Sequence, residues 1–242
     1  MSTLFRASQR GGADHGWLQA RHSFSFADWY EPSRMGFGVL RVLNDDRVAP
    51  HSGFGTHGHR DMEIVTYLLD GALWHKDSMG NGEAGAANAG VILPGEIQRM
   101  SAGSGVMHSE MNRGDTTTHL LQIWLLPRSR GGAPGYEQRQ IEPAAVDGRL
   151  ALLAAPEGGL AYVNSDARLY AGRFDGEQSA RQTIPAGRHC YVHLARGRAR
   201  VQGEWLEAGD AMQFEAEPQD RELHIEQGER AELLVFDLGP AA

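Results

Sequence analysis

Two short runs in this sequence each place two potential metal ligands two residues apart. His57 and His59 flank a glycine, and further along the chain His108 and Glu110 flank a serine. Residues i and i+2 of a β-strand point to the same face, so each run offers two convergent ligands if it lies on a strand. Two such strands side by side would form a site of three histidines and one carboxylate.

The chemistry of these four side chains indicates a transition metal. Neutral imidazoles and a carboxylate suit Fe, Mn, Co, Ni, Cu or Zn, and no thiolate biases the set toward a soft metal. Taken alone, a His-x-His pair is more often an exposed or hydrogen-bonded structural pair. The second run with the same spacing is what favours metal binding, and it predicts one divalent transition metal ion without choosing among the candidates.

Two further pairs have the same spacing. We expect His75 and Asp77 to lie beside the metal site or at the rim of its pocket, the plainer alternative being an exposed polar strand face. His224 and Glu226 have no second pair to join, so we interpret them as ordinary strand alternation.

Composition and charge narrow the function classes. The chain has 242 residues, a formal net charge of -8 and a single cysteine, Cys190. An acidic chain without a long basic run is a poor nucleic-acid binder, and one cysteine excludes an internal disulfide framework. No apolar run approaches the roughly 18 residues that cross a bilayer, and the first residues lack a signal-peptide pattern. We therefore expect a cytoplasmic protein without nucleic-acid or membrane partners.

Glycines, prolines and short apolar runs predict an all-β fold. The 31 glycines and 10 prolines separate apolar stretches of strand length, a pattern typical of sandwiches and barrels with few short helices. A stretch rich in Gly, Pro and Arg between Leu126 and Tyr136 resembles a linker, which predicts domains at 1–128 and 138–242. The expected strands include residues 38–43, 62–69, 90–93, 107–111 and 119–125.

The second half of the sequence repeats the first in outline. Residues 66–71 align with 192–197, and 94–96 align with 208–210, each time as a strand followed by a Gly-containing turn. In this alignment His57 and His59 correspond to Thr183 and Pro185, which are not metal ligands. The repeat predicts a duplicated barrel whose second copy lacks a complete metal site.

Several segments of the chain resemble the pirin family of the cupin superfamily, chiefly residues 57–63, 66–71 and 100–110. Residues 21–30, 43–46 and 136–139 also match, so the resemblance covers nearly the whole chain. The resemblance implies a bicupin, two β-barrels of the double-stranded β-helix type in one chain, with the metal in the N-terminal barrel. In general cupins the acidic metal ligand occupies the position that Glu63 has in this sequence. Pirins take it from the second motif, which implies the ligand set His57, His59, His108 and Glu110 and leaves Glu63 near the site without a defined role.

The chain is most similar to bacterial pirin-like quercetin 2,3-dioxygenases. This implies a metal-dependent dioxygenase that opens the heterocyclic ring of flavonols such as quercetin and releases carbon monoxide, with Glu110 as the proton acceptor. Fe(II) is the first choice of metal, and the partners are a flavonol-like substrate and dioxygen. The alternative is a metal-dependent regulatory or binding protein that acts through a protein partner. A monomer fits two barrels packed in one chain.

The segment between the two motifs, residues 80–90, is rich in glycine, alanine and asparagine. Small residues of this kind predict a surface excursion that bears on access to the pocket rather than on the ligands.

Overall fold

The computed structural model describes residues 2–85 and 90–241, and they form an almost entirely β protein. Residues 86–89 of the segment 80–90 lie outside the described part. Among the described residues the helical elements are the 3-10 turn Ala7–Gln9 and the short helix α1, Pro143–Val146. None of these is long and apolar enough to span a membrane.

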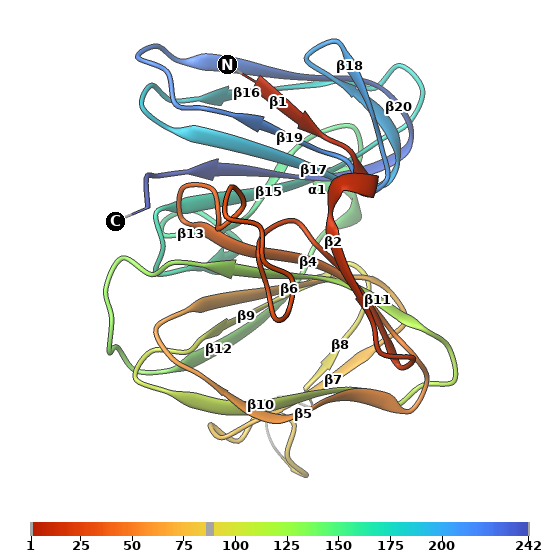
Figure 1. Ribbon diagram of the computed structural model, residues 1–242, viewed down its shortest axis with the longest axis vertical. Coiled ribbons are helices and arrows are strands. Elements are labelled where there is room, and N and C mark those ends of the chain that lie inside the picture. Colours follow the sequence, from red (N-terminus) through yellow and green to blue (C-terminus); the bar gives the residue numbers. More distant parts are fainter. Residues whose placement is uncertain (1, 86–89, 242) are drawn as a thin grey trace.

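The N-terminal half consists of two facing sheets (Figure 1). A seven-stranded sheet has the order β12-β9-β6-β11-β4-β3-β2, and a four-stranded sheet has the order β5-β10-β7-β8. The strands are β2 (Gly11–Asp14), β3 (Leu18–His22), β4 (Leu40–Val48), β5 (Ser52–His59), β6 (Glu63–Asp70), β7 (Leu73–Asp77), β8 (Val91–Ile92), β9 (Glu96–Ser101), β10 (Val106–Asn112), β11 (Thr118–Leu125) and β12 (Gly135–Gln140).

The C-terminal half is a single nine-stranded sheet built around the neighbouring strands β17, β20 and β15, with β16 and β18 pairing to β20 and β17. Its strands are β1 (Ser2–Phe5), β13 (Ala151–Ala155), β14 (Ala161–Tyr162), β15 (Ala167–Phe174), β16 (Ala180–Ile184), β17 (His189–Val201), β18 (Glu204–Glu207), β19 (Ala211–Phe214) and β20 (Arg221–Leu238). The fold agrees with the expected all-β architecture of two barrels.

Two strands do not follow the predicted domain division. The first strand, β1, pairs with β19 and so lies in the C-terminal sheet, where it is the red strand among blue ones in Figure 1. Residue 138, the predicted start of the second domain, lies inside β12, which pairs with β9 of the N-terminal half. The domain limits of 1–128 and 138–242 stay a prediction.

The largest apolar core lies between the two halves. Leu121, Ile123 and Leu125 of β11 belong to the same buried cluster as Phe236 and Leu238 of β20. The intervening side chains of β11 point to the opposite face, into the N-terminal barrel. Because both faces of β11 are covered, its sequence is a nearly continuous apolar run instead of an alternating one.

The interior of the N-terminal barrel has a polar layer between two apolar ones. On β11 the interior side chains are Leu120, Gln122 and Trp124, and the polar one lies in the middle. Thr66 of β6 donates a hydrogen bond to Gln122, which places it in the same layer. Burying a polar group without a hydrogen-bond partner costs free energy, so a polar layer inside the barrel indicates a candidate functional site.

The interior of the C-terminal barrel is apolar instead. Val192, Leu194, Leu223, Ile225 and Leu233 are fully buried in one cluster there. Aliphatic side chains at these positions leave no polar layer of the kind found in the first barrel. The interiors of the two barrels therefore differ in polarity, with polar side chains in the first and aliphatic ones at these positions in the second.

The edge of the second barrel that corresponds to the histidine strands is built in the same way. β16 pairs with the start of β20, and Thr183 lies opposite Glu222. In the first barrel β5 pairs with β10, and His57 lies opposite His108. A hydroxyl and a carboxylate thus stand where the first barrel has two imidazoles, and the Thr183 hydroxyl donates to Glu222.

Candidate metal centre

The four-stranded sheet carries the candidate ligands. β10 lies between β5 and β7, with His57 opposite His108 on one side. On the other side Asp77 lies opposite His108 and His75 lies opposite Glu110. Directly opposed residues in an antiparallel pair point to the same face, so pairing across three strands gathers these side chains in one place.

Three imidazoles form the centre of the site. The ring centroids of His57 and His108 are 4.4 Å apart, and the ring of His59 is 4.8 Å from each of them. One ring nitrogen from each residue lies within 4.8 Å of the others. His57 Nδ1 lies 2.8 Å from the carbonyl oxygen of Gly55 and donates to it, which leaves His57 Nε2 free to bind a cation.

His108 is the residue that best tests whether a metal fits. Its side chain is buried, at 2% exposure, and neither ring nitrogen has a hydrogen-bond partner among the described residues. A buried imidazole normally makes at least one hydrogen bond, and leaving it without one costs free energy. A cation at the centre of the three rings would remove this cost, so the donor set fits a divalent metal ion.

The pKa values of the histidines favour the form that binds a metal. Burial lowers the pKa of His59 to about 4, with a further contribution from the neighbouring His57. Burial and the surrounding imidazoles lower the pKa of His108 to about 2. Both rings are therefore neutral at physiological pH and keep a lone pair for coordination.

Glu110 lies two residues after His108 on β10. It is buried, and its Oε2 accepts a hydrogen bond of 3.0 Å from Gln122 Nε2. The Thr66 hydroxyl donates to Gln122 Oε1 at 3.1 Å, which fixes the orientation of the amide. Burial raises the pKa of Glu110 to about 7 despite the bond from Gln122. The carboxyl group can therefore gain and lose a proton near neutral pH.

A change of register separates Glu110 from the outer histidines. The pairing of β10 with β5 shifts between His108 and Glu110, so that Glu110 lies opposite Phe54. A carboxylate oxygen of Glu110 lies within 4.8 Å of ring nitrogens of His75 and His108. The structure thus brings the four predicted ligands to one sheet as two overlapping groups that share His108.

His75 and Asp77 lie beside the site, on β7. His75 Nε2 is 2.9 Å from Asp77 Oδ2, and both side chains are fully buried. The ring centroid of His75 is 5.3 Å from that of His108. The alternative of an exposed polar strand face is excluded by this burial.

Glu63 faces away from the histidines. Its Oε2 accepts hydrogen bonds from the Ser101 hydroxyl, at 2.8 Å, and from the backbone of Asn164, at 3.2 Å. Glu63 lines a separate cavity of about 230 Å³ with these residues. Thr66 of the same strand points into the barrel, and alternation places Glu63, three residues earlier, on the other face.

Aromatic side chains near the histidines were not among the predicted site residues. The Trp124 ring is 4.9 Å from that of His59, with an edge-on geometry, and Phe26 packs 5.3 Å from Trp124. The Tyr136 ring is 5.0 Å from His75. Only the alternation along 119–125 could have indicated Trp124, because it shares a face with Gln122.

The N-terminal half contains one more buried acidic group that the sequence reasoning missed. Asp46 of β4 is buried, and its Oδ1 has no hydrogen-bond partner among the described residues. Burial, together with the charges of Asp45 and Glu110, raises the pKa of Asp46 to about 8. A neutral carboxyl group at this position can donate a hydrogen bond into the barrel.

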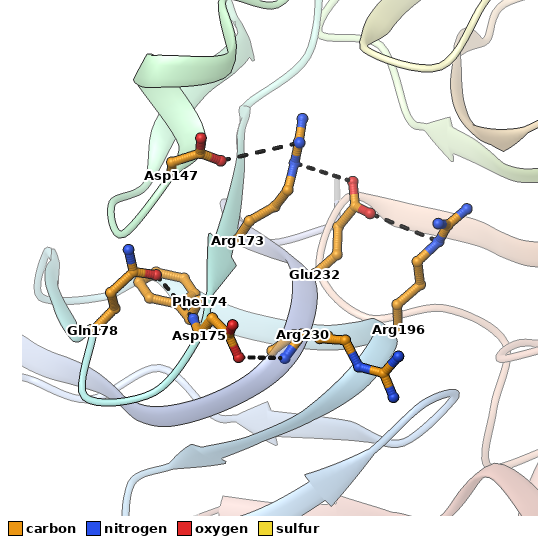
Figure 2. A pocket seen from close by; sticks show the side chains of 9 residues that line it. Asp147, Arg173, Phe174, Asp175, Gln178, Arg196, Arg230 and Glu232 are labelled. Atoms are coloured by element: carbon orange, nitrogen blue, oxygen red, sulfur yellow. Dashed lines mark hydrogen bonds and ion pairs between the residues drawn. The ribbon is translucent and has the colours of Figure 1, made fainter.

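A larger cavity lies away from the metal centre, in the C-terminal half. Figure 2 shows this cavity of about 440 Å³, where Arg173 and Arg196 approach Glu232 from two sides. The guanidinium nitrogens lie 3.9 and 3.7 Å from the carboxylate oxygens. Glu232 also accepts a hydrogen bond of 2.6 Å from the Tyr67 hydroxyl of the N-terminal half. These charges pair with one another within the C-terminal half, the Tyr67 hydroxyl joins them to the N-terminal half, and none of the candidate ligands lines this cavity.

Comparison with protein families identifies both halves. Residues 4–125 match the family model "Pirin", and residues 152–238 match the model "Quercetinase C-terminal cupin domain". A protein named quercetin 2,3-dioxygenase from Escherichia coli strain K12 is 40% identical over 243 residues, which cover 99% of this chain and 100% of that protein. A pirin-like protein of Caulobacter vibrioides is 38% identical over 230 residues, 94% of this chain and 95% of its own length.

A solved structure supports the same comparison. The bacterial pirin YhhW from Escherichia coli, in complex with nickel(II), superimposes with a TM-score of 0.89 at 38% identity, with all of both chains covered. That protein binds a divalent metal ion, in agreement with the donor set described above.

Proposed function

The chain belongs to the pirin family, and from that premise we propose that it is a metal-dependent dioxygenase that opens the heterocyclic ring of flavonols such as quercetin and releases carbon monoxide. The observation that carries the proposal is His108, a buried imidazole with two unpartnered nitrogens, placed between other imidazoles and a buried carboxylate. Full-length similarity to a quercetin 2,3-dioxygenase supports the choice of reaction.

The proposed ligands are His57, His59, His108 and Glu110, which would hold one divalent transition metal ion. Fe(II) is our first choice, since imidazole and carboxylate donors suit it. Nickel(II) is the ion in the related Escherichia coli pirin and is the second ion to test. Four protein ligands leave positions open for a substrate on an ion that takes six.

When bound, the ion would hold the 3-hydroxyl and 4-carbonyl oxygens of the flavonol and lower the pKa of that hydroxyl. Glu110 would accept the hydroxyl proton on Oε1, the carboxylate oxygen that does not accept from Gln122. The pKa of about 7 for Glu110 suits a group that takes up a proton at neutral pH and returns it later. Gln122 would hold the other oxygen in place throughout.

Aromatic rings would position the flavonol. Trp124 lies edge-on to His59, and Tyr136 lies beside His75 on the other side of the cluster. Flat aromatic walls suit a flat aromatic substrate, since stacked or edge-on rings attract one another. The same walls would exclude water from the electron-rich enolate.

The dioxygenase proposal is tested by incubating metal-loaded protein with quercetin in the presence and absence of dioxygen. We expect oxygen-dependent loss of the flavonol absorbance and release of carbon monoxide. No loss with Fe, Ni, Mn, Co, Cu or Zn would overturn the dioxygenase function. A His57→Ala variant that kept both the Co(II) affinity and the Co(II) absorption bands of the wild type would overturn the ligand assignment.

A further inference from the structure

His75 has the orientation of a metal ligand although it lies outside the expected ligand set. Its Nε2 is 2.9 Å from Asp77 Oδ2. Asp77 also accepts from the backbone N–H groups of Met79 and Asn81 and from Asn81 Nδ2, at 2.9, 3.1 and 2.9 Å. A carboxylate with this many donors is an acceptor, so His75 Nε2 carries the hydrogen and His75 Nδ1 carries the lone pair.

The lone pair of His75 Nδ1 accepts no hydrogen bond from the described residues. The residue is 2% exposed, and Nδ1 has no hydrogen-bond partner among the described residues. Histidines that bind metals usually donate their second ring N–H to a carboxylate or a carbonyl, which fixes the ring and leaves the other nitrogen for the metal. His75 with Asp77 and His57 with Gly55 both have this arrangement.

Two buried side chains near His75 could bind the same metal ion. One ring nitrogen each of His75 and His108 and one carboxylate oxygen of Glu110 lie within 4.8 Å of one another. The three residues are 2, 2 and 3% exposed. His75 lies directly opposite Glu110 on adjacent strands, so the sheet itself holds this geometry.

We propose that His75, His108 and Glu110 form a second, inner position for a divalent metal ion, which shares His108 and Glu110 with the outer position proposed above, that of His57, His59, His108 and Glu110. Two imidazoles and one carboxylate are the set that non-haem Fe(II) sites use. The inner position rests on the proposed metal binding at His108 and not on flavonol cleavage. Both positions need His108, so the ion occupies one or the other.

The test removes the outer position and measures Co(II) directly. In a His57→Ala/His59→Ala protein, equilibrium dialysis and elemental analysis should still find one bound Co(II), with visible absorption bands that differ from those of the wild type. Adding His75→Ala should abolish this binding. Adding Lys76→Ala should not, because Lys76 is an exposed neighbour on β7 that pairs with Glu83. Far-UV circular dichroism and thermal unfolding check that each variant folds.

A folded His57→Ala/His59→Ala protein that binds no Co(II), or one whose Co(II) binding survives His75→Ala, would overturn the inner position. If the double variant does not fold, crystals of the wild type soaked in Co(II) decide the question by anomalous scattering. A peak at about 2.1 Å from His75 Nδ1 is expected in a fraction of the molecules. Peaks confined to the outer imidazoles would overturn the proposal. The quercetin assay on the wild type is independent of each of these results.

Discussion

Gln122 controls the carboxylate of the proposed metal site, and Gln122→Leu tests this control. The amide donates to Glu110 Oε2 at 3.0 Å inside the barrel. Leucine has a similar size but no donor, so Glu110 would lose the contact that fixes its carboxylate. We expect the variant to fold and to bind a divalent metal ion more weakly.

The size of the effect follows from the kind of bond that is lost. A hydrogen bond to a charged group contributes about 1.5–3 kcal/mol, and about 1.4 kcal/mol corresponds to a tenfold change in affinity. If the bond acts fully on the ligand form of Glu110, the metal affinity of Gln122→Leu falls roughly 10- to 100-fold. Residues that orient metal ligands contribute in the same range.

The assay is a competition between the protein and a chelator for Zn(II) or Co(II) at fixed pH, with urea unfolding as a check on stability. Thr66→Val is the matched control, because the Thr66 hydroxyl contacts Gln122 and not Glu110. Thr66→Val should weaken binding less than Gln122→Leu does. An unchanged metal affinity in folded Gln122→Leu would refute the role assigned to the amide.

Three further predictions concern other parts of the molecule. Burial and the charge of Arg10 lower the pKa of His193 to about 3, below the value of about 6.5 in the unfolded chain, so stability is lost as pH falls below about 6.5. Replacing His193 with leucine should therefore stabilise the protein at pH 5 by about 2 kcal/mol more than at pH 7.5, and equal effects in urea unfolding at both pH values would contradict this assignment. Burial raises the pKa of the Cys190 thiol, so a thiol reagent should react with it only in the unfolded protein, and rapid labelling of folded protein would show that the thiol is accessible. Tyr67→Phe removes the hydroxyl that donates to Glu232 and should destabilise the protein by about 1.5–3 kcal/mol in urea, whereas Tyr162→Phe, at an exposed site, should change stability little.

Local patterns were sufficient to predict several strands and the histidine pairs. The apolar run at 119–125 corresponds to β11, Thr118–Leu125, and the run at 62–69 corresponds to β6, Glu63–Asp70. The i, i+2 spacing of His57 and His59 reads directly as one face of a strand. These features depend only on neighbours in the sequence, which is why they could be predicted.

The arrangement of the site depends on pairing between distant strands, which no local pattern contains. The register shift between His108 and Glu110 separates the carboxylate from His57 and His59. The pairing of β7 with β10 brings His75 next to Glu110. Gln122 looks like any polar residue in a strand until its partners are known. The cytoplasmic location and the monomeric state stay predictions.

The pairing of β1 with β19 has a consequence for synthesis of the chain. Phe5 lies opposite Ala211, so about 200 residues separate the two partners, which at about 5–20 residues per second corresponds to roughly 10–40 s of translation. Throughout that time Ser2–Phe5 has no strand to pair with, and the N-terminal barrel, whose last strand ends at Gln140, is made before β19. The second barrel must therefore be made before the beginning of the chain can reach its final place.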